Sequence, residues 1–459
     1  FISHQPLLQR SYMSFAVVKA NTMPQTNNDY FIGYLLVFIL AALAGTKGYF
    51  LYKKRQRIEA PIDFGELSSP WSITITVWGF LLIALQFCDP TLLQQPTEQF
   101  YISLSIWLLL FCSTSFAAYT LTYTGSKPVM TGEQRSNEFT NFNKFVFYFL
   151  LSISIVITPI YVKKIMDIVL MFGTEDLMAN VRTLSVYGDT QMGILNYSSV
   201  VNEALLLVAL WSYPRIKLWQ VIWACSACLL NSIAIMEKGG ILLVFFCIMF
   251  LLFEKKKIKI RTILVLSVVM VFLFYVFNLL RAEEDSDYQK NETLLGFIAM
   301  YVMSPPVAYC ELTEDVTQQF GGHTFSLIYV FLNRFGFGPY VISERLQEFV
   351  FVPIPTNVYT IFQPFFLDFG QKGVACFPCF YGIVSGLAYR LMRNGTDFGK
   401  CVYMYTAYIL LLQFYQENVF TVNLHVIQLI FFVYLCTQKR FNFSLLTKHE
   451  QAIRNTAAQ

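Results

Sequence analysis

Apolar runs of nearly membrane-spanning length recur along most of this chain. Each run holds close to the ~20 residues that an α-helix needs to cross a bilayer, and we count about eleven of them, within a range of about ten to thirteen. The predicted transmembrane helices are Tyr30–Tyr52, Trp71–Cys88, Tyr101–Tyr123, Phe145–Val162, Tyr197–Tyr213, Leu218–Met236, Gly239–Phe253, Ile263–Leu280, Gly373–Met392, Cys401–Tyr415 and Phe420–Thr437. The pattern therefore predicts an all-α, polytopic integral membrane protein.

The polar segments between these runs divide the chain into three parts. Residues 30–440 form a single transmembrane domain, and residues 441–459 form a cytoplasmic tail. Residues 1–29 lack the apolar core of a cleavable signal peptide, and we interpret them as a tail in which Met23 is a more natural start than the preceding extension. We expect the first transmembrane helix to act as the insertion signal.

Composition supports the membrane class, because 56% of the residues are hydrophobic and only 14% are charged. A water-soluble domain of this length needs a larger charged surface. The net charge of +4 comes from short basic clusters between the apolar runs rather than from a continuous stripe. Binding to nucleic acid is therefore not predicted.

The basic clusters predict the orientation of the chain. If the first helix ends in the cytoplasm, every strong cluster of lysine and arginine lies on the cytoplasmic side, as the positive-inside rule expects. These clusters are Lys53–Arg55 with Arg57, Lys127 with Arg135, Arg215 with Lys217, Lys255–Lys257 with Lys259 and Arg261, Arg390 with Arg393, and Lys439 with Arg440. We therefore expect a periplasmic N-terminus, a cytoplasmic C-terminus, and two long outer loops at residues 163–196 and 281–372.

The larger outer loop precedes the last three helices and is rich in aromatic and charged side chains. Aromatic faces stack on sugar rings, guanidinium groups bind phosphate oxygens, and carboxylates accept protons, so this content predicts a site for a sugar and a phosphate. Within it, we interpret the amphipathic stretch Phe325–Ile342 as a re-entrant or interfacial piece. Lys238, in a short turn between two helices, lies at a depth that suits a lipid-linked phosphate.

Each of these residues also has a structural interpretation. Asp368 is equally suited to cap a helix or to stabilise a turn. Lys238 and Arg281 are suited to anchor helix ends at the membrane interface. Arg334 lies in a largely apolar stretch, where burial is costly and a functional partner is favoured.

Two polar residues interrupt predicted helices. Glu203 stands a turn or two inside an apolar run, which makes it a functional candidate by default, although it is also suited to pair with a neighbouring polar side chain. His425, in the last run, is interpreted as a hydrogen-bonded core residue. Cys225-x-x-Cys228 and Cys376-x-x-Cys379 lack a histidine or second cysteine pair at ligand spacing, so we predict neither a metal site nor another cofactor.

One segment resembles a family signature. The residues Asn357, Tyr359, Thr360, Pro364, Asp368, Gly370 and Gly373 match the pattern N-x-Y-T-x-x-x-P-x-x-x-D-x-G-x-x-G of the Wzy-type oligosaccharide repeat-unit polymerases, the O-antigen polymerase family. The number of helices and the large outer loop before the last three are also similar to that family. Gly370 and Gly373 are expected to allow a tight entry of the backbone into the membrane.

The resemblance implies a metal-independent glycosyltransferase with a GT-C-like fold in the bacterial inner membrane. Such an enzyme transfers a growing glycan from one undecaprenyl pyrophosphate to the non-reducing end of a repeat unit on another, at the periplasmic face. The lipid-linked oligosaccharide is then donor and acceptor, the bilayer is a second partner, and a chain-length regulator in the same membrane is a third.

The implied chemistry suggests a role for each candidate residue. A carboxylate must deprotonate the acceptor hydroxyl, and cations must neutralise the departing pyrophosphate. We assign the base role to Asp368, with Glu417 as second choice. The residues assigned to pyrophosphate or sugar binding are Arg182, Lys238, Arg281, Arg334, Asn357 and Tyr359.

Two alternatives remain. One is an O-antigen ligase, or another lipid-linked glycan transferase that uses the same donor with a different acceptor. The other, from a different class, is a lipid-linked oligosaccharide flippase or a secondary transporter. Transporters often consist of repeated halves with charges near the middle of the membrane. Most charges here are predicted at the outer face of an asymmetric chain, which favours an enzyme.

Overall fold

The computed structural model describes residues 67–88, 93–122, 142–171, 181, 192–279, 293–314, 319–342, 347–352 and 355–438. The first predicted helix, Tyr30–Tyr52, lies outside these residues. The other predicted transmembrane helices all coincide with helices, so the prediction of a mostly helical membrane protein is confirmed. These helices are α3 (Pro70–Gln86), α4 (Glu98–Leu121), α6 (Lys144–Leu170), α8 (Tyr197–Ser212), α9 (Leu218–Ala234), α10 (Lys238–Glu254), α11 (Ile260–Leu279), α16 (Gln363–Arg393), α17 (Asp397–Leu411) and α18 (Asn423–Cys436).

Capping side chains fix where several of these helices begin. Asn143 Oδ1 accepts a hydrogen bond from the Val146 amide at 3.2 Å before α6, and Thr396 Oγ1 accepts one from the Gly399 amide at 3.2 Å before α17. Ser69 precedes α3, whose first residue is a proline. Such caps satisfy amide groups that would otherwise lack an intrahelical partner.

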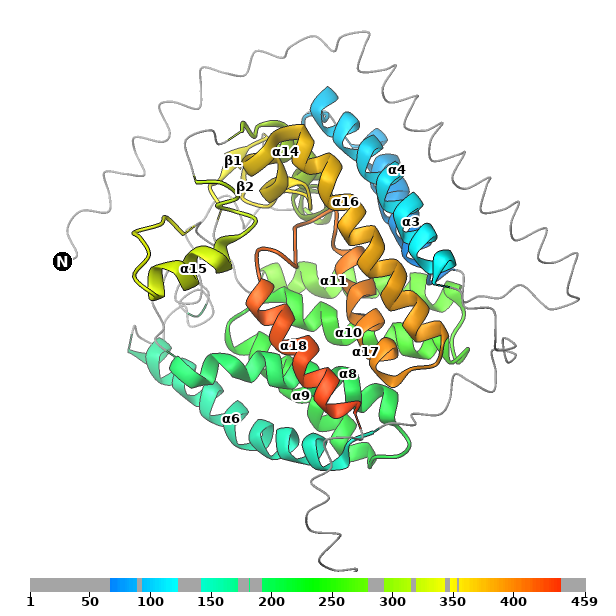
Figure 1. Ribbon diagram of the computed structural model, residues 1–459, viewed down its shortest axis with the longest axis vertical. Helices are drawn as coiled ribbons and strands as arrows, with labels where there is room; N and C mark the ends of the chain where they lie inside the picture. The colour runs from blue at the N-terminus through cyan, green and yellow to red at the C-terminus, as the bar shows by residue number, and fades with distance from the viewer. Residues whose placement is uncertain are drawn as a thin grey trace, which may run out of the picture.

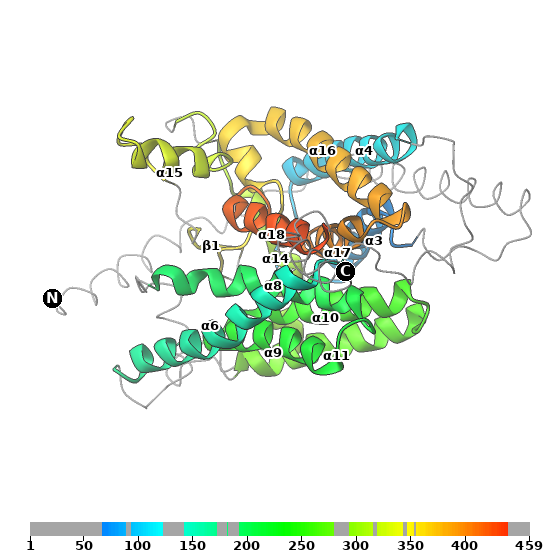
Figure 2. The same ribbon diagram turned by 60° about the horizontal axis from the view of Figure 1, so that its bottom comes forward.

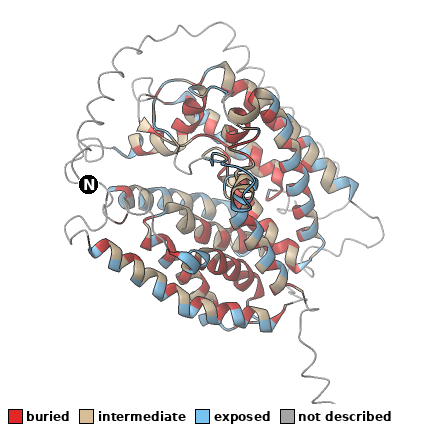
Figure 3. Cartoon of the chain, turned by 60° about the vertical axis from the view of Figure 1, so that its left-hand side comes forward, coloured by how far each residue is buried: buried red, intermediate tan, exposed pale blue. Residues whose placement is uncertain are grey.

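Among the described residues, four helical runs are long and apolar enough to cross a membrane by length and composition, namely Glu98–Leu121, Lys144–Leu170, Gly193–Ser212 and Gln363–Arg393. Shorter apolar helices accompany them. Apolar side chains of α6 and α11, including Phe149, Val156, Val265 and Val268, are exposed. Exposed apolar faces of this kind suit contact with lipid, and Figure 3 shows buried residues mainly on the helix sides that face one another.

The helices form two groups on either side of a central helix. Figure 1 and Figure 2 show α3, α4 and α16 in one group and α6, α8, α9, α10 and α11 in the other. α17 packs against both groups, contacting α3 and α16 on one side and α8 and α10 on the other, while α18 packs against α8. Most side chains of α17 are consequently buried.

α4 and α16 pack closely and run in the same direction. Ser103 Oγ donates to Gln371 Oε1 at 3.1 Å near the start of both helices. Further along, a Cβ atom added at Gly386 would lie 2.3 Å from the Ser115 carbonyl oxygen. A residue without a side chain is therefore required where the two backbones approach each other.

The predicted outer loop 281–372 contains a helical run that the sequence interpretation missed. It consists of α13 (Leu294–Ile298), a π-helical turn η4 (Ala299–Met303) and α14 (Ser304–Cys310). Pro305 and Pro306 made this stretch look like a loop, but they lie at the start of α14, where a missing amide hydrogen costs little. Tyr309 is fully buried, so this run belongs to the core.

Two smaller elements occupy the rest of that segment. α15 (Ser326–Arg334) lies within the predicted amphipathic stretch and has no buried residue. The strands β1 (Val350–Phe351) and β2 (Pro355–Thr356) pair antiparallel, with Val350 opposite Thr356. The helix of the amphipathic stretch is thus confirmed, whereas its interfacial location stays a prediction.

The helix ends gather at two opposite ends of the bundle. At one end, Arg393 lies 3.6 Å from Glu254, and the Asn143 amide donates to the Cys436 carbonyl at 2.8 Å. At the other end, the Ile361 amide donates to the Gln413 carbonyl at 2.9 Å. Ends that were predicted to share a side of the membrane are therefore in contact, while the assignment of those sides stays a prediction from charge.

Candidate functional site

The signature segment lies deep within the bundle rather than over its surface. Thr360, Ile361 and Phe362 are almost completely buried. The Phe362 ring stacks on Trp78 of α3 with centroids 5.3 Å apart and lies at the same distance from Trp107 of α4. Aromatic pairs of this geometry add stability beyond the area they bury. The segment is thus held in a fixed position among the transmembrane helices.

A sharp reversal at Gly370 folds the first part of α16 back on the second. The Phe365 and Phe377 rings stack with centroids 4.1 Å apart, whereas twelve residues of straight helix would separate them by about 18 Å. Gly370 has φ +59°, a conformation that favours glycine, and a Cβ atom at Gly373 would lie 2.2 Å from the Phe365 carbonyl oxygen. The tight turn predicted for these glycines is present, whereas the entry into the membrane stays a prediction. α16 consists of two helical pieces separated at Gly370, and the second begins close to the predicted start at Gly373.

Asp368 lies in the first part of this hairpin, just before the reversal at Gly370, and stabilises a neighbouring turn. Its Oδ1 accepts a hydrogen bond from the His323 amide at 3.1 Å, and its Oδ2 accepts one from the Thr324 amide at 2.7 Å. The carboxylate therefore connects the turn before α15 to α16. From the sequence we expected Asp368 to cap a helix or stabilise a turn in its own segment. The amides that it caps instead belong to a segment more than forty residues upstream.

The two other polar residues of the signature differ in their surroundings. The Tyr359 hydroxyl donates to the Glu348 carbonyl at 2.9 Å. Burial, with smaller contributions from the carboxylates of Glu348 and Glu311, raises the pKa of Tyr359 to about 12. This phenol therefore remains a hydrogen-bond donor at neutral pH and orders the loop. Asn357 is half-buried just after β2.

Glu417 is a buried carboxylate in the turn between α17 and α18. Its Oε1 accepts hydrogen bonds from the Val419 and Phe420 amides at 2.7 and 2.9 Å and from the Tyr381 hydroxyl. Its Oε2 accepts one from the Thr421 amide at 2.7 Å. An ionised carboxylate can satisfy four such donors. To take a proton from a substrate, it would have to give up part of this network.

Lys238 begins α10 and lies against aromatic rings. Its Nζ donates to Asn278 Oδ1 at 2.9 Å and lies 3.7 Å from the centroid of Tyr301 and 5.0 Å from that of Phe297. The Tyr301 hydroxyl donates to the same Asn278 oxygen at 3.0 Å. Cation–π contacts and a shared amide thus hold the ammonium group at one position, where it can bind an anionic group.

Glu203 and His425 form a pair between α8 and α18. Glu203 Oε2 lies 2.9 Å from His425 Nε2, and the two side chains are 18% and 25% exposed. Tyr405, on the central helix α17, lies within electrostatic range of both Glu203 and Glu417. The apolar context of Glu203 was the available signal for a functional residue, but its partner is 222 positions away.

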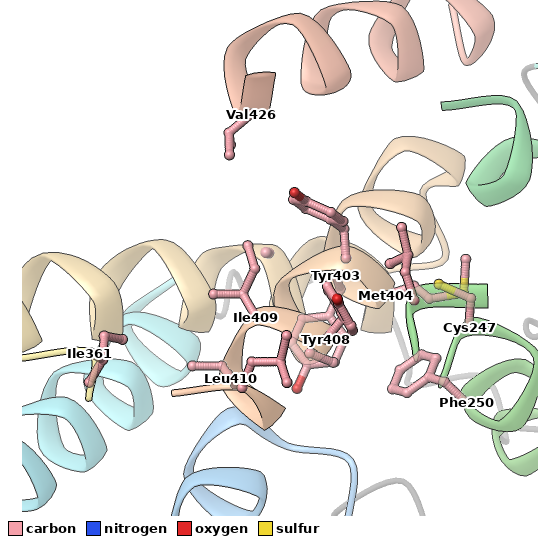
Figure 4. Close-up of a cluster of buried hydrophobic side chains, with 14 of the residues drawn as sticks. Cys247, Phe250, Ile361, Tyr403, Met404, Tyr408, Ile409, Leu410 and Val426 are labelled. Carbon is pink, nitrogen blue, oxygen red and sulfur yellow. The ribbon is translucent and has the colours of Figure 1, made fainter. Parts of the chain in front are cut away.

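An apolar cavity of about 190 Å³ lies between α8, α16, α17 and α18. Its wall includes Leu207, Tyr381, Tyr405, Val426 and Leu429. Figure 4 shows Val426 of α18 across from Ile409 and Tyr408 of α17. Tyr381, whose hydroxyl donates to Glu417, is part of this wall. Leu207, one turn after Glu203, and Val426, directly after His425, are also part of it.

The other cations assigned from the sequence are Arg182, Arg281 and Arg334, and the structure does not place any of them beside Lys238, Glu203 or Glu417 within the described residues. Arg334 is exposed at the end of α15, so the burial cost on which its functional interpretation depended does not arise. Arg182 and Arg281 lie outside the described residues. Within the described ranges, no three His, Cys, Asp or Glu side chains are grouped to hold a metal ion.

Comparison with known proteins relates the chain to one activity. No family model matches the chain, and no solved structure matches it. A curated protein of Escherichia coli (strain K12), described as "Putative O-antigen polymerase", is 31% identical over 127 residues. The match covers 27% of this chain and 31% of that protein, less than a third of each. Over this part of its length, the chain is similar to an O-antigen polymerase.

Proposed function

We propose that this protein polymerises O-antigen repeat units linked to undecaprenyl pyrophosphate, at the periplasmic face of the bacterial inner membrane. The observation that carries the proposal is the buried hairpin of residues 357–377, in which the residues of the signature share one folded unit. The partial similarity to an O-antigen polymerase supports it independently. In this proposal the growing glycan moves to the non-reducing end of a new lipid-linked repeat unit.

The proposed reaction forms one bond and breaks one bond at the same carbon atom. The acceptor hydroxyl oxygen attacks the anomeric carbon of the growing glycan, and the bond from that carbon to the pyrophosphate oxygen breaks. The hydroxyl proton passes to a base on the protein, and undecaprenyl pyrophosphate leaves with the bonding electrons. The protein must therefore supply a proton acceptor and a stabilised positive charge near the leaving group.

Lys238 is the described residue best suited to stabilise the leaving group. Its ammonium group is fixed by Asn278 and Tyr301 at the end of the bundle where the signature segment enters. Arg182, Arg281 and Arg334 are proposed as additional cations. We propose that Asn357 and Tyr359 shape the loop that receives the sugars, because Tyr359 already orders that loop.

The resemblance makes Asp368 the proposed base and Glu417 the second choice, and the contacts give both residues a positioning role as well. Asp368 fixes the turn before α15, and Glu417 fixes the turn before α18. Both turns lie beside the hairpin, since the Phe420 and Phe325 rings each lie within 6.4 Å of Phe377. The two carboxylates thus shape the proposed site whether or not they exchange protons.

Deletion of the gene tests the proposed function. A polymerase mutant should lose the ladder of long O-antigen chains and keep one repeat unit on the lipopolysaccharide core. Expression of the full chain should restore the ladder, and the Lys372→Met variant serves as a control for expression because that side chain is exposed. Loss of every repeat unit, including the first, would instead indicate a ligase or a flippase. A preserved ladder contradicts all three assignments.

Reconstitution separates the remaining possibilities. Purified full-length protein in liposomes should lengthen lipid-linked repeat units isolated from the deletion strain, without added metal ion or cofactor. A chain-length regulator is proposed as a partner in the same membrane, so the products of the isolated protein should vary more in length than those of cells. Movement of the lipid-linked glycan across the bilayer without lengthening would identify a flippase.

A further inference from the structure

The Glu203–His425 pair is an ionisable pair placed among apolar transmembrane helices. α8 is buried along most of its length, yet it carries a carboxylate whose oxygen lies 2.9 Å from an imidazole nitrogen of α18. Ionisable side chains in such surroundings are costly and are usually retained for function. The pair lies near the outer ends of both helices, because His425 is in the first turn of α18 and Glu203 is in the second turn of α8.

The titratable groups around this pair come from three other helices. Tyr405 and Tyr408 of α17, Cys228 of α9 and Cys247 of α10 all lie within electrostatic range of Glu203. None of these four side chains is a cation or a second carboxylate. Within the described residues, His425 is the ion-pair partner of Glu203.

The contacts of the three site carboxylates differ in kind. Asp368 accepts hydrogen bonds from two backbone amides, and Glu417 accepts them from three backbone amides and the Tyr381 hydroxyl. Glu203 instead contacts an imidazole, the side chain that takes up and releases protons near neutral pH. When Glu203 is ionised, its carboxylate can only accept, so His425 Nε2 then donates the hydrogen bond and Nδ1 carries the lone pair.

Residues that neighbour this pair on α8 and α18 form part of the wall of the apolar cavity. Val426 and Leu429, which follow His425 on α18, and Leu207, one turn after Glu203 on α8, all line it. An apolar cavity among transmembrane helices suits part of a lipid substrate rather than water. A lipid-linked sugar bound here would bring its polar part toward the outer ends of α8 and α18, where the pair lies.

We propose that His425, in place of Asp368, is the proton acceptor of the glycosyl transfer and that Glu203 is its positioning residue. The assignment rests on the proposed function. The acceptor hydroxyl loses its proton to His425 Nδ1 as its oxygen bonds to the anomeric carbon. Glu203 holds the ring through Nε2–H and stabilises the imidazolium until the proton is released.

Rates measured on the reconstituted full-length protein test this assignment, with lipid-linked repeat units from the deletion strain as substrate. His425→Gln should lower the rate by about 100-fold or more, the usual loss when a general base is removed. Glu203→Gln should cause a smaller loss, on the order of tenfold, because a weaker hydrogen bond remains. It should also move the acidic limb of the pH–rate profile to lower pH, since a neutral amide stabilises an imidazolium less than a carboxylate does.

Two variants separate catalysis from a purely structural contact. The double exchange Glu203→His with His425→Glu keeps the pair but moves the imidazole to α8, so a structural contact predicts recovery of the rate and a catalytic base predicts none. Ser154→Ala is the matched control, because Ser154 hydrogen-bonds Asn202 and Trp223 between the neighbouring helices. It should lower the melting temperature and leave the pH–rate profile unchanged.

The outcomes distinguish failure of this assignment from failure of the proposed function. Recovery in the double exchange, or a His425→Gln rate within threefold of an active wild type, overturns the assignment alone. A wild-type protein that lengthens no lipid-linked repeat unit overturns the proposed function. A large loss in His425→Gln with no recovery on exchange, together with the displaced pH limb in Glu203→Gln, supports the assignment.

Discussion

Asp368 accepts two backbone hydrogen bonds from the turn before α15, and its substitution separates a positioning role from proton transfer. Asp368→Asn keeps one side-chain acceptor, so we expect its rate to stay within about tenfold of wild type, whereas loss of a general base costs about 100-fold or more. Asp368→Ala leaves two amides unsatisfied, at a cost of about 1–3 kcal/mol each if they stay buried. Reconstituted rates and melting temperatures provide the measurement.

The opposite result would be equally informative. If Asp368→Asn is present at normal levels and melts like wild type but loses more than about 100-fold in rate, Asp368 itself exchanges the proton. That result would restore the base role assigned from the signature and would remove it from His425.

Lys238 offers a second single-residue prediction. Lys238→Met keeps the length of the side chain but removes the ammonium group that Asn278 and Tyr301 hold. We expect kcat/KM for the lipid-linked substrate to fall by about 10- to 100-fold, because a charge-assisted hydrogen bond contributes about 1.5–3 kcal/mol. Kinetics at several substrate concentrations check this.

Lys372→Met is the matched control, since Lys372 is an exposed lysine near the same end of the bundle. Its kinetics should equal those of wild type. A Lys238→Met variant within twofold of wild type would show that Lys238 only anchors the helix, the interfacial role that its position also suits.

Single residues differ in how far the sequence alone determines their roles. Glu203 could be recognised because a carboxylate interrupts an apolar run, but nothing local to it indicates a histidine 222 positions away. Asp368 could be recognised from the signature, yet its partners belong to a distant turn. The expected burial of Arg334 was wrong because the helix that carries it is exposed.

At the scale of elements, apolar length predicted most helices correctly because each helix must cover about the same thickness of hydrocarbon. The failures have local causes. α13, η4 and α14 were missed because two prolines interrupt the apolar run. The short helical piece of α16 before Gly370 was missed because the chain reverses at that glycine.

The reversal at Gly370 gives a prediction at this scale. Gly370→Ala should destabilise the fold by about 1–3 kcal/mol, because φ +59° with ψ −149° is a backbone conformation that residues with a side chain rarely adopt. The new Cβ atom would also meet the Glu314 carboxylate, 2.1 Å away, which must move aside. We expect a lower melting temperature together with shortened O-antigen chains.

Gly336→Ala controls for backbone strain alone. Gly336 has φ +79° and open space where a Cβ atom would lie, in the exposed turn after α15. It should lose a similar stability but retain long chains. Equal loss of polymerisation in both variants would show that the hairpin contributes through stability only.

At the scale of the whole molecule, composition predicted the membrane class, but the grouping of helices around α17 required the structure. The apolar runs alone do not distinguish lipid-facing helices such as α11 from the nearly enclosed α8. Helices buried on all sides and helices facing lipid are both apolar, since hydrocarbon and protein interior exclude charge alike.

The orientation of the whole molecule in the membrane can be tested by cysteine labelling. In a background with the exposed Cys376 replaced by serine, Gln416→Cys should react with a membrane-impermeant maleimide in intact cells. Lys257→Cys, in the exposed turn after α10, should react only after the membrane is permeabilised. Reaction in the reverse order would place the candidate site in the cytoplasm and would contradict the proposed function.

The helical parts of α17 and α18 have 15 and 14 residues, or about 22 and 21 Å at 1.5 Å per residue. This length falls about 8 Å short of a hydrocarbon layer of about 30 Å. The layer must thin locally or admit solvent above their ends. Under the proposed function, a carrier lipid diffusing sideways into such a thinned region could bring its head group deeper along α17 and α18 without turning over.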